Sequence, residues 1–426
     1  MPDGTATSNL YKPKLATILA EGYGLADLRH DAMAGLTVAV LALPLSMAIA
    51  VASGVSPERG LYTAIIGGFV VSAFGGSRFQ IGGPAGAFIV LVSATVAKFG
   101  VDGLILTVLL SGLMLALVGA LRLGGLIRHI PHPVTVGFTA GIAVTILASQ
   151  IKDLAGLKLA GGEPGPVLPK LMALGEALPT FNPAALGVGV GVAAIILVMR
   201  KYRPTWPGML VGVVVATVAA TLLHLPVETI GSRFGGIPHG LPAPHVPGAS
   251  WGMLLAVLPA ALSFTLLGGL ESLLSAKVAD TMTGRVHRSN MELVAQGLAN
   301  VASAVFGGIA VTGTIARTAT NIRAGARSPV AGMLHAAFLL AFMLLAASLA
   351  SYIPLAALAG VLVVVAWNMA EKKEFASLLG NWRAAAVLLA TFGLTIVHDL
   401  MAGIMAGCAV ALVCWASSRI WRRLRA

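Results

Sequence analysis

The chain has 426 residues, of which 57% are hydrophobic and only 10% are charged, and its mean hydropathy is +0.91. A soluble domain carries about 25% charged residues, so there is too little charge here to cover a globular surface. The net charge of +12 comes from Lys and Arg scattered over short loops without a basic stripe, which argues against a nucleic-acid-binding protein.

Apolar segments of about 17–25 residues, the length that crosses a bilayer, recur along the whole chain. They predict an all-α integral membrane protein with fourteen transmembrane segments. Segments three and ten are too short to span as helices, and both follow glycine-rich stretches. The fourteen segments are expected at 32–52, 59–75, 84–97, 103–121, 133–151, 183–199, 207–225, 251–276, 290–306, 313–324, 329–350, 354–370, 384–397 and 400–418.

The charges predict the orientation. Residues 1–31 are polar and have no signal-peptide core, and 419–426 form a basic tail. With the N-terminus in the cytoplasm, 21 of the 28 Lys and Arg residues fall in cytoplasmic loops and tails, and six fall outside. This bias follows the positive-inside rule, so both termini are expected in the cytoplasm.

Two halves of the chain look alike. Phe74-Gly75-Gly76 precedes the first short segment, and Phe306-Gly307-Gly308 precedes the second. Ile130-Pro131 and Ile353-Pro354 open the fifth and twelfth segments. Because seven spans is an odd number, the second repeat must be inverted in the membrane. Inverted repeats with paired interrupted helices predict a transporter whose binding site lies at the interruptions.

The two interruptions predict an anion site. In the first, Pro84 suits the first turn of a short helix that begins at mid-membrane. In the second, a helix is expected to begin after Gly313. Two helix N-termini that face each other present unsatisfied N–H donors and positive dipole ends. The alternative interpretation is glycine-mediated helix packing. The candidate substrate contacts are Pro84, Ala85, Gly86, Gly313, Thr314, Ile315, Ala316, Arg317 and Ser275.

Two ionisable residues are expected deep in the membrane. Glu271 lies in the middle of segment eight, where a charged carboxylate is costly. Desolvation there favours the protonated form, so Glu271 is expected to hold and release a proton. Arg317 opens segment ten and could neutralise a substrate anion or form a permanent structural pair with Glu271. His335 is interpreted as a hydrogen-bonded core histidine. A solvated loop is expected to hold Asp280, Arg285, His287, Arg288 and Glu292.

No catalytic or metal-binding pattern is visible. Cys408 and Cys414 lie six residues apart in the last apolar segment, which is no metal or redox spacing. The deep polar residues include no nucleophile and base pair, so an enzyme, a cofactor and a metal are not expected.

At these residues the sequence resembles the sulfate permease (SulP) family, also called solute carrier family 26. The resemblance covers essentially the whole chain and is most specific at Glu271–Leu274, Gln296–Asn300 and Arg317–Gly325. Three stretches are most similar to the bacterial branch that couples protons to C4-dicarboxylates: Gln150–Asp153, Ile315–Arg317 and Val365–Met369.

The resemblance implies a fold and a function. A core domain at about 32–121 and 251–350 would move like an elevator against a gate domain at about 133–225 and 354–418. The implied activity is symport of a proton and a small dicarboxylate such as fumarate across the bacterial inner membrane. The alternative is a sulfate, bicarbonate or chloride exchanger or channel-like carrier. The oligomeric state stays open, with a homodimer as one option.

The sequence departs from the family pattern in two places. Leu45 follows Pro44 where many members have glutamine, which makes the site more apolar. A cytoplasmic STAS domain, usual after the last span, is expected to be absent. Sodium-coupled bicarbonate members have aspartate at the position of Glu271 and a non-basic residue at that of Arg317, so sodium coupling is disfavoured.

Overall fold

A computed structural model describes residues 11–127, 131–160, 164, 167–204, 206–398 and 400–424. Residues 1–10 of the predicted N-terminal segment, Ile130, and residues 425–426 of the predicted basic tail lie outside the described residues.

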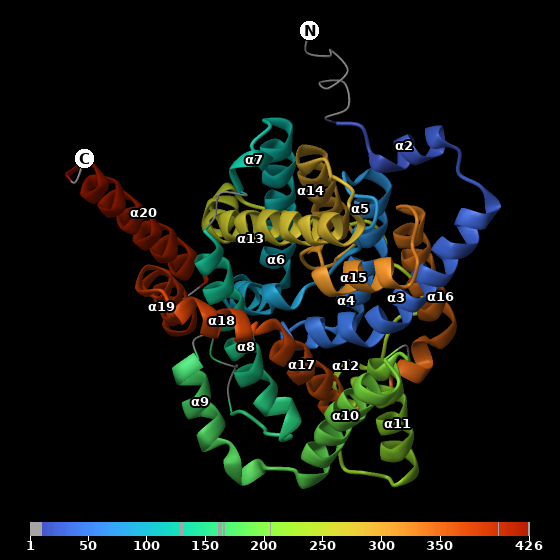
Figure 1. The fold of residues 1–426 in the computed structure, drawn as a ribbon. Helices are drawn as coiled ribbons and strands as arrows, with labels where there is room; N and C mark the ends of the chain where they lie inside the picture. The colour runs from blue at the N-terminus through green and yellow to red at the C-terminus, as the bar shows by residue number, and fades with distance from the viewer. Residues whose placement is uncertain are drawn as a thin grey trace.

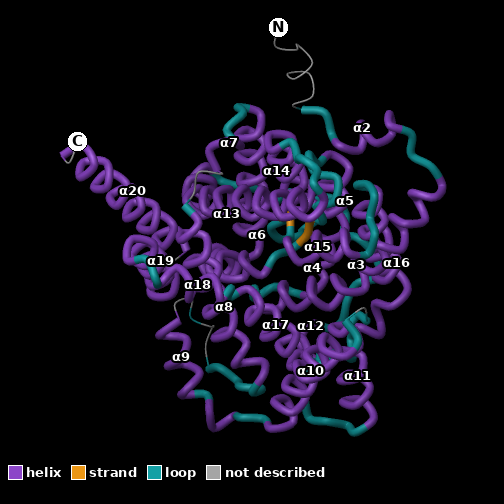
Figure 2. Tube along the Cα trace, viewed as in Figure 1, coloured by secondary structure: helices purple, strands orange, loops and turns teal. Residues whose placement is uncertain are grey.

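Helices dominate the described chain, and two short strands lie among them (Figures 1 and 2). In chain order the elements are α2 (Lys14–Glu21), α3 (Leu25–Ala52), α4 (Pro57–Tyr62), the π-helical turn η1 (Thr63–Gly67), α5 (Gly68–Phe74), β1 (Gly82–Gly83), the 3₁₀ turn η2 (Gly86–Phe88), α6 (Ile89–Ala120), α7 (Gly124–Ile127), α8 (His132–Leu154), α9 (Val167–Glu176), the 3₁₀ turn η3 (Leu178–Thr180), α10 (Pro183–Tyr202), α11 (Gly208–Leu222), α12 (Ile230–Phe234), α13 (Trp251–Thr283), α14 (Ser289–Val305), β2 (Thr312–Gly313), α15 (Ile315–Arg323), α16 (Val330–Ala350), α17 (Leu355–Met369), α18 (Lys372–Leu379), α19 (Trp382–Val397) and α20 (Leu400–Leu424).

The predicted all-α membrane fold of fourteen segments is confirmed. Among the described residues, seven helices are long and apolar enough to cross a membrane, and α11, α19 and part of α20 are shorter apolar helices. The second predicted segment is the continuous run α4–η1–α5. Predicted segments three and four are the two helical parts of α6, which are separated at Gly100, where φ is 70° and ψ is −174°. Segment ten is the short helix α15.

Local sequence explains where several of these helices begin. Asn182 precedes α10, and its side chain accepts hydrogen bonds from the N–H groups of Ala184 and Ala185. Asn381 caps α19 in the same way, and Ser250 caps α13. Each cap satisfies N–H groups that the first helical turn leaves without a partner, which fixes the first residue of the span.

The helices pack into two groups. In the first group, α6 packs against α13 and α14, α3 packs against α16, and α15 packs against α3 and α13. In the second group, α8 packs against α17 and α19, α10 packs against α11 and α17, and α19 packs against α20. The groups meet mainly where α3 contacts α17 and α11. The chain therefore crosses between the two groups three times, before α8, before α13 and before α17.

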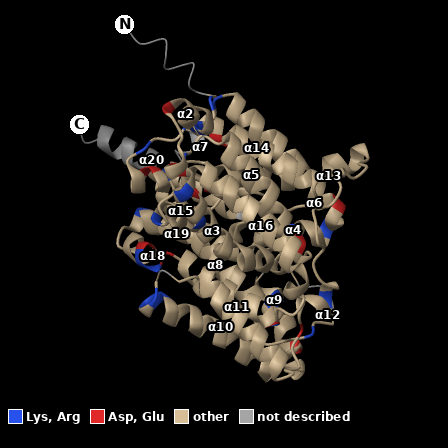
Figure 3. Cartoon of the chain, turned by 90° about the vertical axis from the view of Figure 1, so that its right-hand side faces the viewer, with Lys and Arg blue, Asp and Glu red and all other residues tan. Residues whose placement is uncertain are grey.

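Charged residues lie toward the ends of the helices. Figure 3 shows broad uncharged areas over α16, α13 and α11, with Lys, Arg, Asp and Glu gathered near α2, α18 and α12. Large apolar side chains are exposed in those areas, among them Val214, Leu266 and Leu345, which is 84% exposed. An apolar belt between charged ends is the surface that a lipid bilayer requires.

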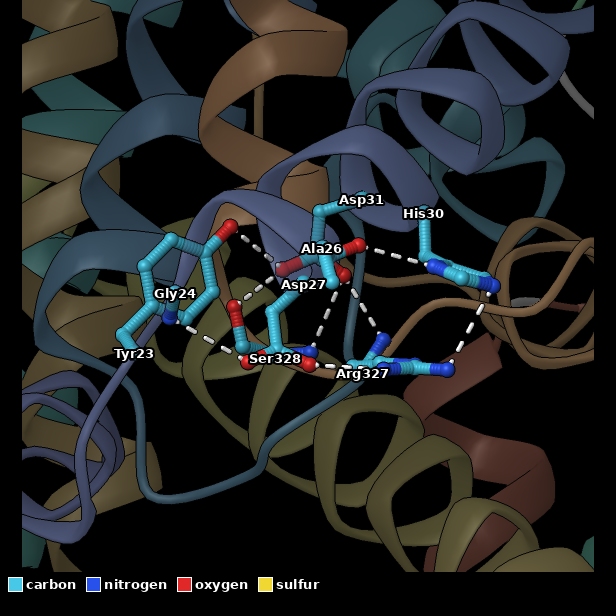
Figure 4. A network of polar contacts seen from close by, with 8 residues as sticks. All are labelled: Tyr23, Gly24, Ala26, Asp27, His30, Asp31, Arg327 and Ser328. Atoms are coloured by element: carbon cyan, nitrogen blue, oxygen red, sulfur yellow. Dashed lines mark hydrogen bonds and ion pairs between the residues drawn. The ribbon is translucent and has the colours of Figure 1, made fainter.

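A polar network fixes the start of α3 (Figure 4). The Asp31 carboxylate is fully buried and accepts hydrogen bonds from the backbone N–H groups of Arg327 (2.6 Å) and Ser328 (3.1 Å), from the Ser328 hydroxyl, and from the Tyr23 hydroxyl (2.9 Å). Burial and the Asp31 carboxylate raise the pKa of Tyr23, so its hydroxyl stays protonated and donates. Arg327 also pairs with Asp27 at 2.8 Å. The network ties the N-terminal end of α3 to the loop before α16.

Candidate functional site

The two predicted interruptions are hydrogen-bonded to each other. β1 and β2 pair antiparallel, with Gly82 opposite Gly313 and Gly83 opposite Thr312. The pairing continues beyond the strands, because the N–H and hydroxyl of Thr314 donate to the Ile81 carbonyl at 3.0 and 3.3 Å. The sequence predicted non-helical backbone here but not this pairing. It brings segments 230 residues apart into one unit, drawn orange near α15 in Figure 2.

Side chains of the second repeat hold the first interruption. The Thr318 hydroxyl accepts a hydrogen bond from the Ile81 N–H at 3.1 Å and shares another of 3.1 Å with Ser275. The Asn321 side chain donates to the Phe79 carbonyl at 3.0 Å. The Gln80 amide donates to the Ser272 hydroxyl at 2.9 Å. Polar backbone at this depth therefore has partners in protein, as the absence of water requires.

The second interruption is held in a comparable way. The Asn300 side chain donates to the Val311 carbonyl at 2.8 Å and accepts from the Val311 N–H at 2.9 Å. The Thr63 hydroxyl of η1 accepts from the Ile309 N–H at 2.7 Å. The Asn300 side chain thus makes the two hydrogen bonds to Val311 that a neighbouring strand would otherwise make. Thr63 links the second interruption to the first repeat.

Glu292 corrects the sequence-based interpretation. It was expected in a solvated loop, but it lies in α14 and is fully buried. Its carboxylate accepts hydrogen bonds from the backbone N–H groups of Gly76 (2.8 Å) and Ser77 (3.0 Å), where the chain leaves α5. The position in the first helical turn was the available signal, because an acidic side chain there can also reach free N–H groups of a neighbouring loop.

Both short helices begin without a side-chain cap. η2 starts at Gly86 after Ala85, and α15 starts at Ile315 after Thr314, and neither preceding side chain accepts a bond from the first turn. The N–H groups of these first turns therefore remain available to an anion. Pro84 was predicted in the first turn, but it lies in the extended segment two residues before η2.

Arg317 points into the first helix group. Its side chain is only 1% exposed, and one guanidinium nitrogen donates to the Ser46 hydroxyl of α3 at 3.1 Å. Its Nε and Nη1 atoms have no hydrogen-bond partner in the described chain. A Cβ on Gly83 would lie 2.1 Å from Nη1, so only glycine leaves room for the guanidinium beside β1. Arg317 thus places a positive charge directly behind the two helix starts.

Glu271 does not bind Arg317 in this structure. Ser46 is the only hydrogen-bond partner of the guanidinium within the described residues, so the alternative of a permanent Glu271–Arg317 pair is not formed. Glu271 lies on α13 between Gly268, whose carbonyl accepts from Thr312, and Ser275, which bonds Thr318. Its side chain is partly exposed, in contrast to the fully buried Ser272 beside it. The carboxylate therefore lies at the edge of the packed interruptions.

The remaining predicted contacts differ in exposure. Ile315 is 40% exposed, Ala316 is exposed and Gly86 is partly exposed, so these three residues face open space at the helix starts. A Cβ on Gly86 would lie 3.5 Å from Ile146 of α8 and from Met369 of α17. The second helix group thus reaches the first of the two helix starts. The other predicted contacts are buried: Pro84, Ala85, Gly313, Thr314 and Ser275.

His335 is buried without a hydrogen-bond partner, which differs from the predicted hydrogen-bonded core histidine. Both of its ring nitrogens lack partners among the described residues, and its side chain is fully buried in α16. Its backbone packs on Gly35 of α3, because a Cβ on Gly35 would lie 3.0 Å from the backbone nitrogen of His335. No group of three or more His, Cys, Asp or Glu able to hold a metal occurs in the described chain.

Comparisons with known proteins agree with this arrangement. The model of the sulfate permease family matches residues 28–391. A putative sulfate transporter of Bacillus subtilis, YvdB, is 45% identical over 92% of this chain and 74% of its own length. The bicarbonate transporter BicA of Picosynechococcus is 33% identical over 91% of this chain and 70% of its own. Neither of these two is named as a dicarboxylate carrier, so that narrower implication stays a prediction.

Solved structures show the same fold. The transmembrane domain of a cyanobacterial bicarbonate transporter BicA superposes with a TM-score of 0.80 at 32% identity, over 89% of this chain and 98% of that chain. Murine Slc26a9, in the inward-facing state, gives a TM-score of 0.88 at 18% identity, over 98% of this chain and 73% of that chain. These relatives are named as transporters and not as enzymes, and the family model and the sequence identities show that this chain belongs to the sulfate permease family.

Proposed function

We propose that this chain is a secondary transporter of a small inorganic oxyanion, of the sulfate and bicarbonate class. The observation that carries the proposal is the pair of uncapped helix starts, at Gly86 and Ile315, joined by β1 and β2 with Arg317 behind them. The free backbone N–H groups and the two positive dipole ends stabilise an anion without the help of a flexible side chain.

The charge of the site fits a compact anion. Arg317 is the only arginine among the buried residues of the described chain, so one full positive charge supplements two partial ones. β1 and β2 hold the two helix starts together, which favours a compact anion over a longer one. The names of the relatives, sulfate and bicarbonate transporters, point to the same class of anion.

We propose that transport occurs by movement of the first helix group, as a core domain, against the second, as a gate domain. The anion site lies within the first group, and Ile146 and Met369 of the second group reach Gly86. Sliding one packed body past the other exposes such a site alternately to the two sides, as in transporters with inverted repeats.

Proton coupling is a second proposal, and it rests on Glu271. This carboxylate lies in α13 without an ion-pair partner in the part of the chain that the structure describes, close to Ser275, which ties α13 to α15. Moving a charged carboxylate through a closed, dry passage is costly, so protonation is expected to accompany the loaded transition.

Proteoliposome uptake tests the proposed substrate class. The purified chain is expected to take up labelled sulfate or bicarbonate, each measured with and without an imposed pH gradient. Labelled fumarate serves as the competitor substrate, because it represents the dicarboxylate interpretation. Saturable uptake of fumarate without uptake of either inorganic anion would replace the proposal with dicarboxylate symport. Uptake of none of these anions would contradict both.

The proposed orientation places both termini in the cytoplasm and residues 226–250 outside. Gly240 suits a labelling test, because a Cβ there has no neighbour within 4 Å. In a variant without Cys408 and Cys414, Gly240→Cys is expected to react with an impermeant maleimide in right-side-out cells, whereas Arg285→Cys reacts only after permeabilisation. The reverse pattern would invert the orientation.

A further inference from the structure

A crevice of about 550 Å³ separates the two helix groups. Its walls come from α3, α4 and α16 of the first group and from α11 of the second, and its end is formed by Tyr352, Ile353 and Ile237. The face of α11 at its mouth is exposed, with Val214 and Val218 each 50% and Leu222 72% exposed. The crevice is therefore open to whatever surrounds the helices, which in a membrane is hydrocarbon.

The crevice walls offer almost no polar group. The Thr217 hydroxyl donates to the Val213 carbonyl and the Thr221 hydroxyl to the Thr217 carbonyl, each at 2.8 Å, so both are satisfied within α11. The remaining polar side chain is Tyr352, which is 55% exposed at the end of the crevice. Water needs two to four polar partners in such a space, so neither water nor an anion is stable there. An empty crevice would in turn forfeit the dispersion contacts of its walls.

The length of the crevice matches one membrane leaflet. The lining runs from Leu210 to Leu222 on α11, a length of roughly 18 Å at 1.5 Å per residue. That length is close to one leaflet, or half of a hydrocarbon core of about 30 Å. An extended apolar occupant of leaflet length, oriented along α11, therefore fits the lining.

We propose that this crevice binds one acyl chain of a membrane phospholipid, between α11 and the α3–α16 pair. The chain runs along α11, and the lipid headgroup lies at the level of Tyr352, because tyrosine side chains favour the membrane–water interface. Lipid tails are as apolar as the side chains of the walls, so packing and the high lipid concentration keep the crevice filled.

The bound chain lies where the two groups would slide. This consequence rests on the proposed function, because it requires movement of the first group against the second. A flexible chain can change shape as the walls shift, whereas a fixed side chain of the same volume cannot. A bulky residue in the crevice is thus expected to slow transport without touching the anion site.

Photolabelling tests the proposal independently of transport. The full chain is reconstituted in phosphatidylcholine doped with phosphatidylcholine that carries a mid-chain diazirine, irradiated, and mapped by peptide mass spectrometry. Adducts at Thr217 and Phe342 are expected to exceed those at Val215 and Leu345, which are 47% and 84% exposed but do not line the crevice. Equal or lower labelling of the crevice residues would refute the proposal.

Matched variants sharpen the result. Ala346→Trp places an indole in the crevice, whereas Leu345→Trp places one on the outer face of the same helix. Ala346→Trp is expected to remove the excess labelling at Thr217, and Leu345→Trp to retain it. Thr217→Trp, from the opposite wall, repeats the test at Phe342 if Ala346→Trp fails to fold. Undiminished labelling in a folded filled variant, or cross-links between two copies at these residues without lipid adducts, would overturn the assignment.

Discussion

Replacing Ala316 with tryptophan is expected to reduce anion uptake to the level of protein-free liposomes. Ala316 lies in the first turn of α15, is exposed, and stands beside N–H groups that no side chain caps. An indole there occupies the space of the anion and covers the donors. The packed interruptions beneath it, held by Asn300, Thr318 and Asn321, are not touched, so the fold is expected to persist. Uptake is measured together with the thermal midpoint.

The control for this variant is Ala341→Trp. Ala341 is exposed on α16, away from the two helix starts, so a tryptophan there is expected to leave both uptake and stability near those of the parent chain. Wild-type uptake by Ala316→Trp would show that the anion binds elsewhere. Loss of both uptake and thermal stability would show instead that this position is required for packing.

Replacing Glu271 with glutamine is expected to abolish accumulation driven by a pH gradient while anion exchange continues. Glutamine resembles the protonated carboxyl group in shape and has no charge, so the loaded transition remains available but is no longer linked to a proton. The measurement compares the ratio of internal to external anion with and without the gradient, and then the exchange of labelled for unlabelled anion. The ratio is expected to fall to passive equilibrium, with exchange retained.

Glu292→Gln is the matched control, because it makes the same substitution at a buried carboxylate on another helix of the first group, α14. Glu292 accepts hydrogen bonds from the N–H groups of Gly76 and Ser77, so its neutralisation weakens charge-assisted bonds worth about 1.5–3 kcal/mol. The expected result is a lower thermal midpoint with an unchanged response to the pH gradient in the protein that remains folded. A wild-type gradient response in Glu271→Gln would assign Glu271 a purely structural role.

The sequence predicted the membrane segments well because their signal is local. Apolar length, loop charge and paired glycine-rich interruptions can be recognised without knowing which helices are neighbours. The predicted first residues of the two short helices were also nearly right. η2 begins at Gly86 and α15 at Ile315, each within two residues of its predicted start. A helix that is short, amphipathic and at the surface, such as α2 or α18, has no comparable apolar signal and was missed.

The partners of buried polar groups could not be predicted, because they come from distant parts of the chain. Glu292 follows a polar loop in sequence, yet its carboxylate binds backbone of the other repeat 216 residues away. Glu271 was one of the two partners considered for Arg317, whereas its guanidinium donates to Ser46 of α3. These pairings depend on how the two repeats interlock, and no single segment encodes that arrangement.

The interlocked interruptions also constrain the order in which the protein can be made. The backbone around Ile81 needs Thr318, Thr314 and Asn321, which the ribosome adds more than 230 residues later. Until α15 emerges, placing this stretch in the hydrocarbon would leave its polar groups without partners, which costs several kcal/mol per group. Nascent α5 and α6 must therefore remain near water, lipid headgroups or the insertion machinery. The native membrane protein can form only after most of the chain has been synthesised.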